Sequence, residues 1–214
     1  MRQLTIALPK GRLLPTAIES FARIGVTLSG YSRDSRALVF SSDDGSCRFL
    51  IAKPMDVPTF VEYGAADLGV VGSDVLMEAE HDVLRPLDLR YGGCRIVLAA
   101  PQESADEPLA LHTVHRVATK YPNITARYFA GRGLHVETIK LYGSVELAPS
   151  TELSSLIVDL VQTGVTLREN GLVVVDEIAS TSAWLIANRA SHKIRFAEVT
   201  DVIRQLTEAT SCRS

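Results

Sequence analysis

The chain has 214 residues, of which 46% are hydrophobic and 22% charged, a composition typical of a globular protein with one large or two small domains. Its formal net charge of −3 does not favour nucleic acid as a partner, and no apolar run is long enough to span a membrane. The short N-terminal apolar run lacks a signal-peptide cleavage site, and the three cysteines are widely spaced without a zinc motif. We therefore expect a cytoplasmic protein in a reducing compartment.

The first half of the chain alternates strand and helix patterns. Apolar residues at helical spacing follow the first short strand and end before Gly25, and the run Asp43-Asp44-Gly45-Ser46 has the composition of a hairpin turn. Pro58 is expected to break its helix, and the acidic residues 101–108 indicate a surface connection. The predicted elements are strands over residues 4–8, 37–41, 48–52, 67–72 and 94–99, and helices over residues 14–21, 57–63 and 74–79.

The second half repeats the alternation. Its predicted elements are strands over residues 116–119, 136–141, 172–175 and 183–188, and helices over residues 124–130, 153–161 and 199–206. The strand over 183–188 is expected to return to the first block. This order predicts an α/β protein with two lobes and a cleft between them, where ligands commonly bind.

Residues 159–167 form the most informative motif. The hydroxyl groups of Thr163 and Thr166 and the backbone of Gly164 can cradle a phosphate, since successive N–H groups in such a turn bind anions. The Asp159 carboxylate beside them suits sugar hydroxyls or a magnesium ion. The alternative is an ordinary helix end capped by Gly164.

Three further candidate sites follow predicted strands. Lys10 and Arg12 flank Gly11 before a helix, which suits an anion, although a solvated basic turn is the alternative. Lys53 and Asp56 also follow a strand, and a simple helix start explains them as well. The third of these turns contains Gly72, which allows a ligand to approach the backbone closely. The alternative is that Ser73 or Asp74 caps the next helix.

Other signals are weak. The run Gly131-Arg132-Gly133 lacks the strand-before, helix-after context of a dinucleotide site. His112 and His115 have helical spacing but no nearby third ligand for a metal, and Trp184 is interpreted as a core anchor.

The turns around Lys10, Asp56, Gly72 and Gly164, together with the segments between them, resemble sequence blocks of the ATP phosphoribosyltransferase family, the first enzymes of histidine biosynthesis. The resemblance covers nearly the whole chain, with Glu152 where the family signature usually has glycine and Lys53 where many members have arginine. The matching blocks are Pro9-Lys10-Gly11-Arg12, Asp56-Val57-Pro58-Thr59, Gly64-Ala65-Ala66-Asp67-Leu68-Gly69, Gly72-Ser73-Asp74-Val75-Leu76, Ala118-Thr119-Lys120-Tyr121, Ile139-Lys140-Leu141-Tyr142-Gly143-Ser144, and Glu146 through Asp159 to Leu167.

The resemblance implies the transfer of a phosphoribosyl group from phosphoribosyl pyrophosphate to N1 of ATP, with Mg²⁺. It implies a two-lobed fold like a type II periplasmic binding protein, with the active site in the cleft. The lobes would be residues 1–93 plus 179–214, and residues 94–178, without the C-terminal regulatory domain of long-form members. A short form of this kind works as a homo-oligomer within a hetero-oligomer, together with a regulatory subunit similar to histidyl-tRNA synthetase.

The resemblance also assigns roles to residues. The 5-phosphate would be held by the turn Thr163, Gly164, Val165, Thr166 and Leu167. Glu146 or Asp159 would hold ribose hydroxyls or Mg²⁺. The pyrophosphate or ATP would be bound by Lys10, Gly11, Arg12, Lys53, Asp56 and Gly72. Two other hypotheses remain open: a non-catalytic two-lobed binding module, and a phosphoribosyltransferase for another base.

Overall fold

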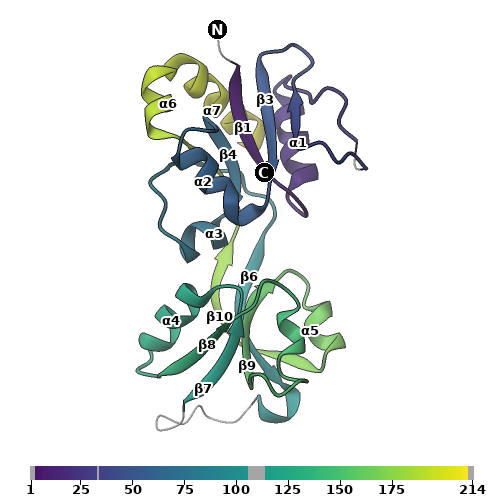
Figure 1. The fold of residues 1–214 in the computed structure, drawn as a ribbon, viewed down its shortest axis with the longest axis vertical. Helices are drawn as coiled ribbons and strands as arrows, with labels where there is room; N and C mark the ends of the chain where they lie inside the picture. Colours follow the sequence, from purple (N-terminus) through teal and green to yellow (C-terminus); the bar gives the residue numbers. More distant parts are fainter. Residues whose placement is uncertain (1–2, 33, 106–113, 212–214) are drawn as a thin grey trace. The chain divides into compact units, whose positions relative to one another are not determined.

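The computed structural model of the chain describes residues 3–32, 34–105 and 114–211 (Figure 1). His112, Cys212 and the predicted connection beyond residue 105 lie outside the described residues. The chain divides into two compact units, the first made of Met1–Leu76, Glu80–Gly92 and Ser182–Ser214, the second of Met77–Ala79 and Gly93–Thr181. Each unit has its own β-sheet and its own hydrophobic core. None of the helices over the described residues is long and apolar enough to cross a membrane.

The first unit is built on a six-stranded sheet in the order β2-β3-β1-β4-β11-β5. Its strands are β1 (Leu4–Pro9), β2 (Val39–Ser41), β3 (Cys47–Ala52), β4 (Leu68–Gly72), β5 (Leu84–Asp88) and β11 (Ala183–Ala187). The helices are α1 (Leu14–Arg23), α2 (Val57–Glu62), α6 (Arg189–Ile194) and α7 (Phe196–Ser211), and α3 (Ser73–Glu78) begins in this unit.

Two apolar clusters cover the two faces of this sheet. One cluster joins Leu14 and Phe21 of α1 to Leu206 of α7, and the other joins Val61 of α2 to Val75 of α3. β1 is buried along its whole length and is parallel to both β3 and β4, so the carboxyl ends of these three strands lie at one edge. The turns that follow them are thereby brought to the same edge of the sheet.

The prediction that Pro58 breaks its helix is wrong. α2 begins at Val57, and Pro58 lies in its first turn, where the missing N–H group has no helical partner to lose. The hairpin predicted around Gly45 is confirmed, since β2 and β3 pair in antiparallel register on either side of it. β5 was not predicted, because Arg85 and Pro86 interrupt its apolar pattern.

The second unit has a five-stranded sheet in the order β10-β6-β9-β7-β8, with α4 and α5 on opposite faces (Figure 1). Strands β7, β8 and β9 are parallel to one another, and β6 is antiparallel to both β9 and β10. The elements are β6 (Cys94–Pro101), β7 (His115–Thr119), α4 (Pro122–Ala130), β8 (Val136–Lys140), β9 (Leu156–Val161), α5 (Val165–Glu169) and β10 (Leu172–Thr181). Two 3-10 turns, Gln102–Ser104 and Val145–Leu147, complete it.

The helix predicted over residues 153–161 is wrong. This segment contains β9, which lies between β6 and β7, and the run Leu156-Ile157-Val158 is buried on both faces of the sheet. A strand covered on both sides has a continuous apolar run rather than an alternating one, so its pattern also fits a helix face. The motif over residues 159–167 is therefore a strand, a turn and a helix. The alternative role of Gly164 as a helix C-cap is also wrong, since this residue precedes α5.

Candidate active site

One group of candidate residues lies at the strand ends of the first unit. The Lys10 N–H donates to the Ala52 carbonyl over 2.7 Å, so the backbone of Lys10 runs next to the start of Lys53. The side chains of Lys10 and Lys53 are exposed. Between Lys10 and Arg12, Gly11 has a φ of 100°, a conformation that L side chains rarely adopt. The turn thus needs its glycine, and it leaves two lysine charges at one edge of the sheet.

Arg12 is tied to the protein on one side. Its Nη2 donates to the Gly92 carbonyl over 3.1 Å, within the first unit. The remaining guanidinium donors of this exposed side chain can serve an anion, because Arg offers five in all.

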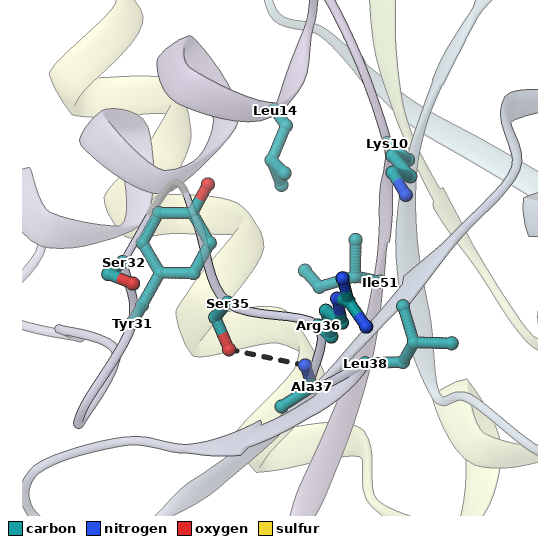
Figure 2. Close-up of a pocket in the computed structure, with 9 residues that line it drawn as sticks. All are labelled: Lys10, Leu14, Tyr31, Ser32, Ser35, Arg36, Ala37, Leu38 and Ile51. Atoms are coloured by element: carbon teal, nitrogen blue, oxygen red, sulfur yellow. Dashed lines mark hydrogen bonds between the residues drawn. The ribbon is translucent and has the colours of Figure 1, made fainter.

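Lys10 also lines a pocket of about 320 Å³ that contains a second cation, Arg36 (Figure 2). The other lining residues are Leu14, Tyr31, Ser32, Ser35, Ala37, Leu38 and Ile51. The ring of Tyr31 packs edge-on against Phe40 at 5.5 Å, and the Ser35 hydroxyl accepts a bond of 3.2 Å from the Ala37 N–H. These contacts fix the loop that carries Arg36. A pocket with one lysine and one arginine at its wall suits a phosphate group.

Sequence reasoning missed Arg36. It lies in a polar loop before β2, and Lys10, which lines the same pocket, is distant in the sequence. The available signal was the polar run from Ser32 to Arg36 between two apolar segments.

Asp56 and Gly72 occupy the same edge of the first sheet but have different surroundings. Asp56 is exposed, occupies the N-cap position of α2 without a side-chain capping bond, and lines a shallow depression with Phe60 and Tyr63. A Cβ at Gly72 would lie 2.1 Å from Oδ1 of the buried Asp74. A side chain at position 72 would therefore force the Asp74 carboxylate to move.

The second group of candidate residues lies in the second unit, between β9 and α5. Gly164 has a φ of 75° and is the N-cap of α5, with no side-chain capping bond. Thr163 and Thr166 are exposed on either side of it, and buried Leu167 anchors the turn to the core. Arg168 reaches back, with Nη1 donating to the Thr163 carbonyl over 3.3 Å. The left-handed glycine and the uncapped helix start leave backbone N–H groups available to an anion.

Asp159 lies two residues before the end of β9, on the sheet face that carries Ile157 and Val161. The pKa of Asp159 is raised to about 6, chiefly because burial disfavours the charged form. The negative charge of Glu146 also raises this pKa, whereas the hydrogen bond from the Leu160 N–H and the positive charge of Lys120 lower it. Glu146 lies in the 3-10 turn Val145–Leu147. Two carboxylates and one ammonium group thus lie close enough to act on one another electrostatically, near the turn over residues 162–166. Oxygen ligands of this kind suit ribose hydroxyls or Mg²⁺.

Two of the weaker sequence signals have structural explanations. Gly131 and Gly133 follow α4 instead of preceding a helix, and Arg132 between them stacks on Tyr128 and pairs with Asp176 over 2.8 Å. Among the residues that the structure describes, no three His, Cys, Asp or Glu side chains form a cluster that could hold a metal ion. Trp184 packs against the core of the first unit, as predicted.

Glu152, the departure from the family signature, has a φ of 57°. Its N–H donates to the Pro149 carbonyl over 3.1 Å, and the Leu153 N–H donates to the Ala148 carbonyl over 3.0 Å. These two bonds make a Schellman motif, whose left-handed residue is usually glycine. The chain therefore keeps the glycine-type backbone at this position with a side chain that disfavours it.

Replacing Glu152 with glycine is expected to stabilise the protein by about 0.5–1 kcal/mol, because the left-handed penalty of an L side chain exceeds the extra entropy of glycine in the unfolded chain. Urea unfolding measures the change. Ser150→Gly in the same segment is the control and should destabilise, since its hydroxyl donates to the Leu147 carbonyl over 2.9 Å. Destabilisation by Glu152→Gly would contradict the conformational account.

Comparison with known proteins identifies the family. The profile described as "HisG: ATP phosphoribosyltransferase" matches residues 53–208. The chain is 54% identical over 204 residues to an ATP phosphoribosyltransferase of Syntrophotalea carbinolica, covering 95% of this chain and 93% of that protein. It is 49% identical over 207 residues to that of Citrifermentans bemidjiense, covering 96% and 97%.

Solved structures agree in fold. The ATP phosphoribosyl transferase (HisG:HisZ) complex from Thermotoga maritima contains a chain 35% identical, with a TM-score of 0.84 and coverage of 98% and 99%. The periplasmic aliphatic sulphonate binding protein SsuA from Escherichia coli is 15% identical with a TM-score of 0.59, covering 99% of this chain and 73% of SsuA, which shows a shared fold alone. The α/β fold of periplasmic-binding-protein type predicted from the sequence is confirmed.

Proposed function

The chain belongs to the ATP phosphoribosyltransferase family, and we propose that two groups of its residues carry the family's reaction. That reaction joins N1 of ATP to phosphoribosyl pyrophosphate and releases pyrophosphate, as the first step of histidine biosynthesis. The observation that carries the residue assignment is the strand–turn–helix of the second unit, with left-handed Gly164 close to the half-buried Asp159 carboxylate.

In this proposal the turn of the second unit binds the 5-phosphate through Thr163, Gly164, Val165, Thr166 and the backbone at Leu167. Asp159 and Glu146 accept hydrogen bonds from the ribose hydroxyls. The proximity of a phosphate cradle and an acidic pair on one sheet face supports the assignment, because a phosphoribosyl group presents both needs within a few ångströms.

The cations of the first unit meet the other charges of the substrates. Lys10, Lys53 and Arg36 bind the pyrophosphate or the ATP phosphates, with Arg12 contributing its free donors and Gly11 allowing close approach. Adenine N1 has its own lone pair, so the reaction needs no strong general base. The protein's task is to position two anionic substrates and to stabilise the departing pyrophosphate.

Magnesium fits the acidic pair. A hard cation takes oxygen ligands and is commonly held by one or two carboxylates together with substrate phosphates, which Asp159 and Glu146 can supply. When bound, it would neutralise charge on the pyrophosphate.

Thr166→Val is expected to weaken the binding of phosphoribosyl pyrophosphate by about 10- to 100-fold, since a hydrogen bond to a charged group contributes about 1.5–3 kcal/mol. Calorimetry measures the affinity, and thermal melting should be unchanged because Thr166 is exposed. Thr207→Val, at an exposed threonine of α7, is the matched control and should bind normally. Equal affinity of both variants for phosphoribosyl pyrophosphate would contradict the assignment of the 5-phosphate site to this turn.

Pyrophosphate release with ATP, and then with other bases, tests the reaction itself. Release with ATP alone supports the proposal. Binding without release would favour a non-catalytic module, and release with a different base would favour another phosphoribosyltransferase.

The partner is part of the proposal. The Thermotoga maritima relative is a HisG:HisZ complex, and this chain covers 99% of its chain. We expect a regulatory subunit of that type, similar to histidyl-tRNA synthetase, in a hetero-oligomer with several copies of each chain. Histidine should inhibit the chain only with this partner, because inhibition needs a site that binds two states unequally. Inhibition of the purified chain alone, at concentrations too low for competition with substrate, would contradict a separate regulatory subunit.

A further inference from the structure

Arg168 of α5 lies against the turn over residues 162–166, and the reaction described above does not use its side chain. The Arg168 Nη1 donates to the Thr163 carbonyl over 3.3 Å. A Cβ at Gly164 would lie 3.4 Å from the same Nη1 atom, so the guanidinium group covers this glycine closely. Arg168 thus places a cation directly on the backbone that is proposed to hold the 5-phosphate.

Arg168 also binds the next carbonyl of the turn. Its backbone N–H donates to the Gly164 carbonyl over 3.1 Å. One residue therefore engages two successive carbonyl groups, those of Thr163 and Gly164. Carbonyl oxygens carry partial negative charge and repel a phosphate, whereas backbone N–H groups attract it. A turn that binds an anion through its N–H groups needs its carbonyls held in this way.

The backbone of Arg168 is itself well anchored. The preceding residue, Leu167, is buried in an apolar cluster of the second unit, and the Gly171 N–H donates to the Arg168 carbonyl over 3.0 Å. Within the described parts of the chain, Arg168 joins no ion pair. The guanidinium group is therefore fixed at its base, and no carboxylate of these parts competes with the Thr163 carbonyl for its donors.

We propose that Arg168 is a positioning residue for phosphoribosyl pyrophosphate, which holds the Thr163 and Gly164 carbonyls so that the turn presents its N–H groups to the 5-phosphate. This role rests on the proposed function of the turn. Without the guanidinium group, the Thr163 carbonyl loses its partner and the peptide group that follows it can rotate. The turn then has to be ordered at the moment of binding, which lowers the affinity.

The first test needs no substrate. Nitrogen-15 relaxation measures the order parameters of the Gly164 and Val165 amides, which should fall in Arg168→Met because the Thr163 carbonyl is released. Arg116→Met is the matched control: its exposed guanidinium group donates to the Glu152 carbonyl over 3.4 Å, near the amino end of β7, whereas the turn follows the carboxyl end of the parallel strand β9. Unchanged order parameters in Arg168→Met overturn the proposal.

The second test is calorimetry with phosphoribosyl pyrophosphate and, separately, with inorganic pyrophosphate, which lacks the 5-phosphate. Arg168→Met should bind phosphoribosyl pyrophosphate about fivefold more weakly than the unmodified chain, and Arg116→Met should bind it normally. The affinity for pyrophosphate and the melting temperature should not change, which a general loosening of the fold would not achieve. Equal losses for both ligands would overturn the proposal.

Salt distinguishes positioning from a simple attraction between charges. The fivefold loss in Arg168→Met should persist at about 0.5 M KCl, where the attraction between exposed charges is largely screened. A loss that disappears in this salt would make Arg168 an electrostatic contact of the substrate and overturn the positioning role. Absence of binding by the unmodified chain would overturn the proposed function itself, and the relaxation measurement distinguishes that result from a failure of Arg168 to hold the turn.

Discussion

Asp159→Asn is expected to raise the thermal stability of the ligand-free protein at pH 7.5 and to weaken the binding of phosphoribosyl pyrophosphate by about 100-fold or more. Burial raises the pKa of this carboxyl to about 6 from its ordinary 3.8, so ionisation costs the folded state free energy. The neutral amide avoids a cost of about 3 kcal/mol. It also loses the charge that binds ribose hydroxyls, each worth about 1.5–3 kcal/mol.

The sign of the pH dependence checks this account. A carboxyl with a raised pKa in the folded state costs stability above that pKa, and the cost disappears as the pH falls from about 6 towards 3.8. The melting-temperature difference between Asp159→Asn and the unmodified chain should therefore shrink over the same range.

Asp176→Asn is the control with the opposite sign. Hydrogen bonding from Tyr128 lowers the pKa of Asp176, helped by Arg132, so its charged form stabilises the fold and its loss should lower the melting temperature at neutral pH. Normal substrate affinity in Asp159→Asn would remove Asp159 from the site, whatever the melting temperature.

Sequence patterns predicted the elements whose signals are local. The helix α1 has its apolar face at regular spacing, and the β2–β3 hairpin has Asp44, whose carboxylate accepts from the Ser46 N–H over 3.0 Å and shapes the turn. The strand β9 was mistaken for a helix because the choice depends on its pairing with β6 and β7 and on the apolar clusters of α4 and α5, which cover its two faces. β5 was missed because an edge strand paired only with β11 needs no apolar alternation.

The candidate site shows the same division. The glycine- and threonine-rich turn over 162–166 was readable because its residues are adjacent in the chain. Arg36 and Lys120 were not recognised as site residues, because each acts together with a residue that is distant in sequence. Arg36 lines a pocket with Lys10, and the charge of Lys120 acts on Asp159. Strand register, which the sequence does not specify over such distances, creates these neighbourhoods.

Asp67 shows how a residue inside a family block can serve the fold instead of the substrate. Its side chain is buried, and its carboxylate accepts from the Thr5 N–H over 2.8 Å, the Ser191 hydroxyl over 2.7 Å and Arg195 Nη1 over 3.0 Å. These bonds join β1, α6 and the start of α7 to the residue before β4. The Arg195 side chain is only 15% exposed, so its charge depends on this partner and on Glu198.

Asp67→Ala is therefore expected to destabilise the protein by about 3–5 kcal/mol, because it removes the acceptor of three hydrogen bonds, which come from the Thr5 N–H, the Ser191 hydroxyl and the largely buried Arg195. For a chain of this size the melting temperature should fall by about 10 °C. Glu19→Ala is the control: it breaks an exposed i,i+4 ion pair with Arg23, and such pairs contribute at most about 0.5 kcal/mol. The double variant Asp67→Ala with Arg195→Met should recover part of the loss, since the largely buried cation that lost its Asp67 partner is then gone. If Asp67→Ala instead melts normally and loses only substrate affinity, then Asp67 belongs to the active site and the network is incidental.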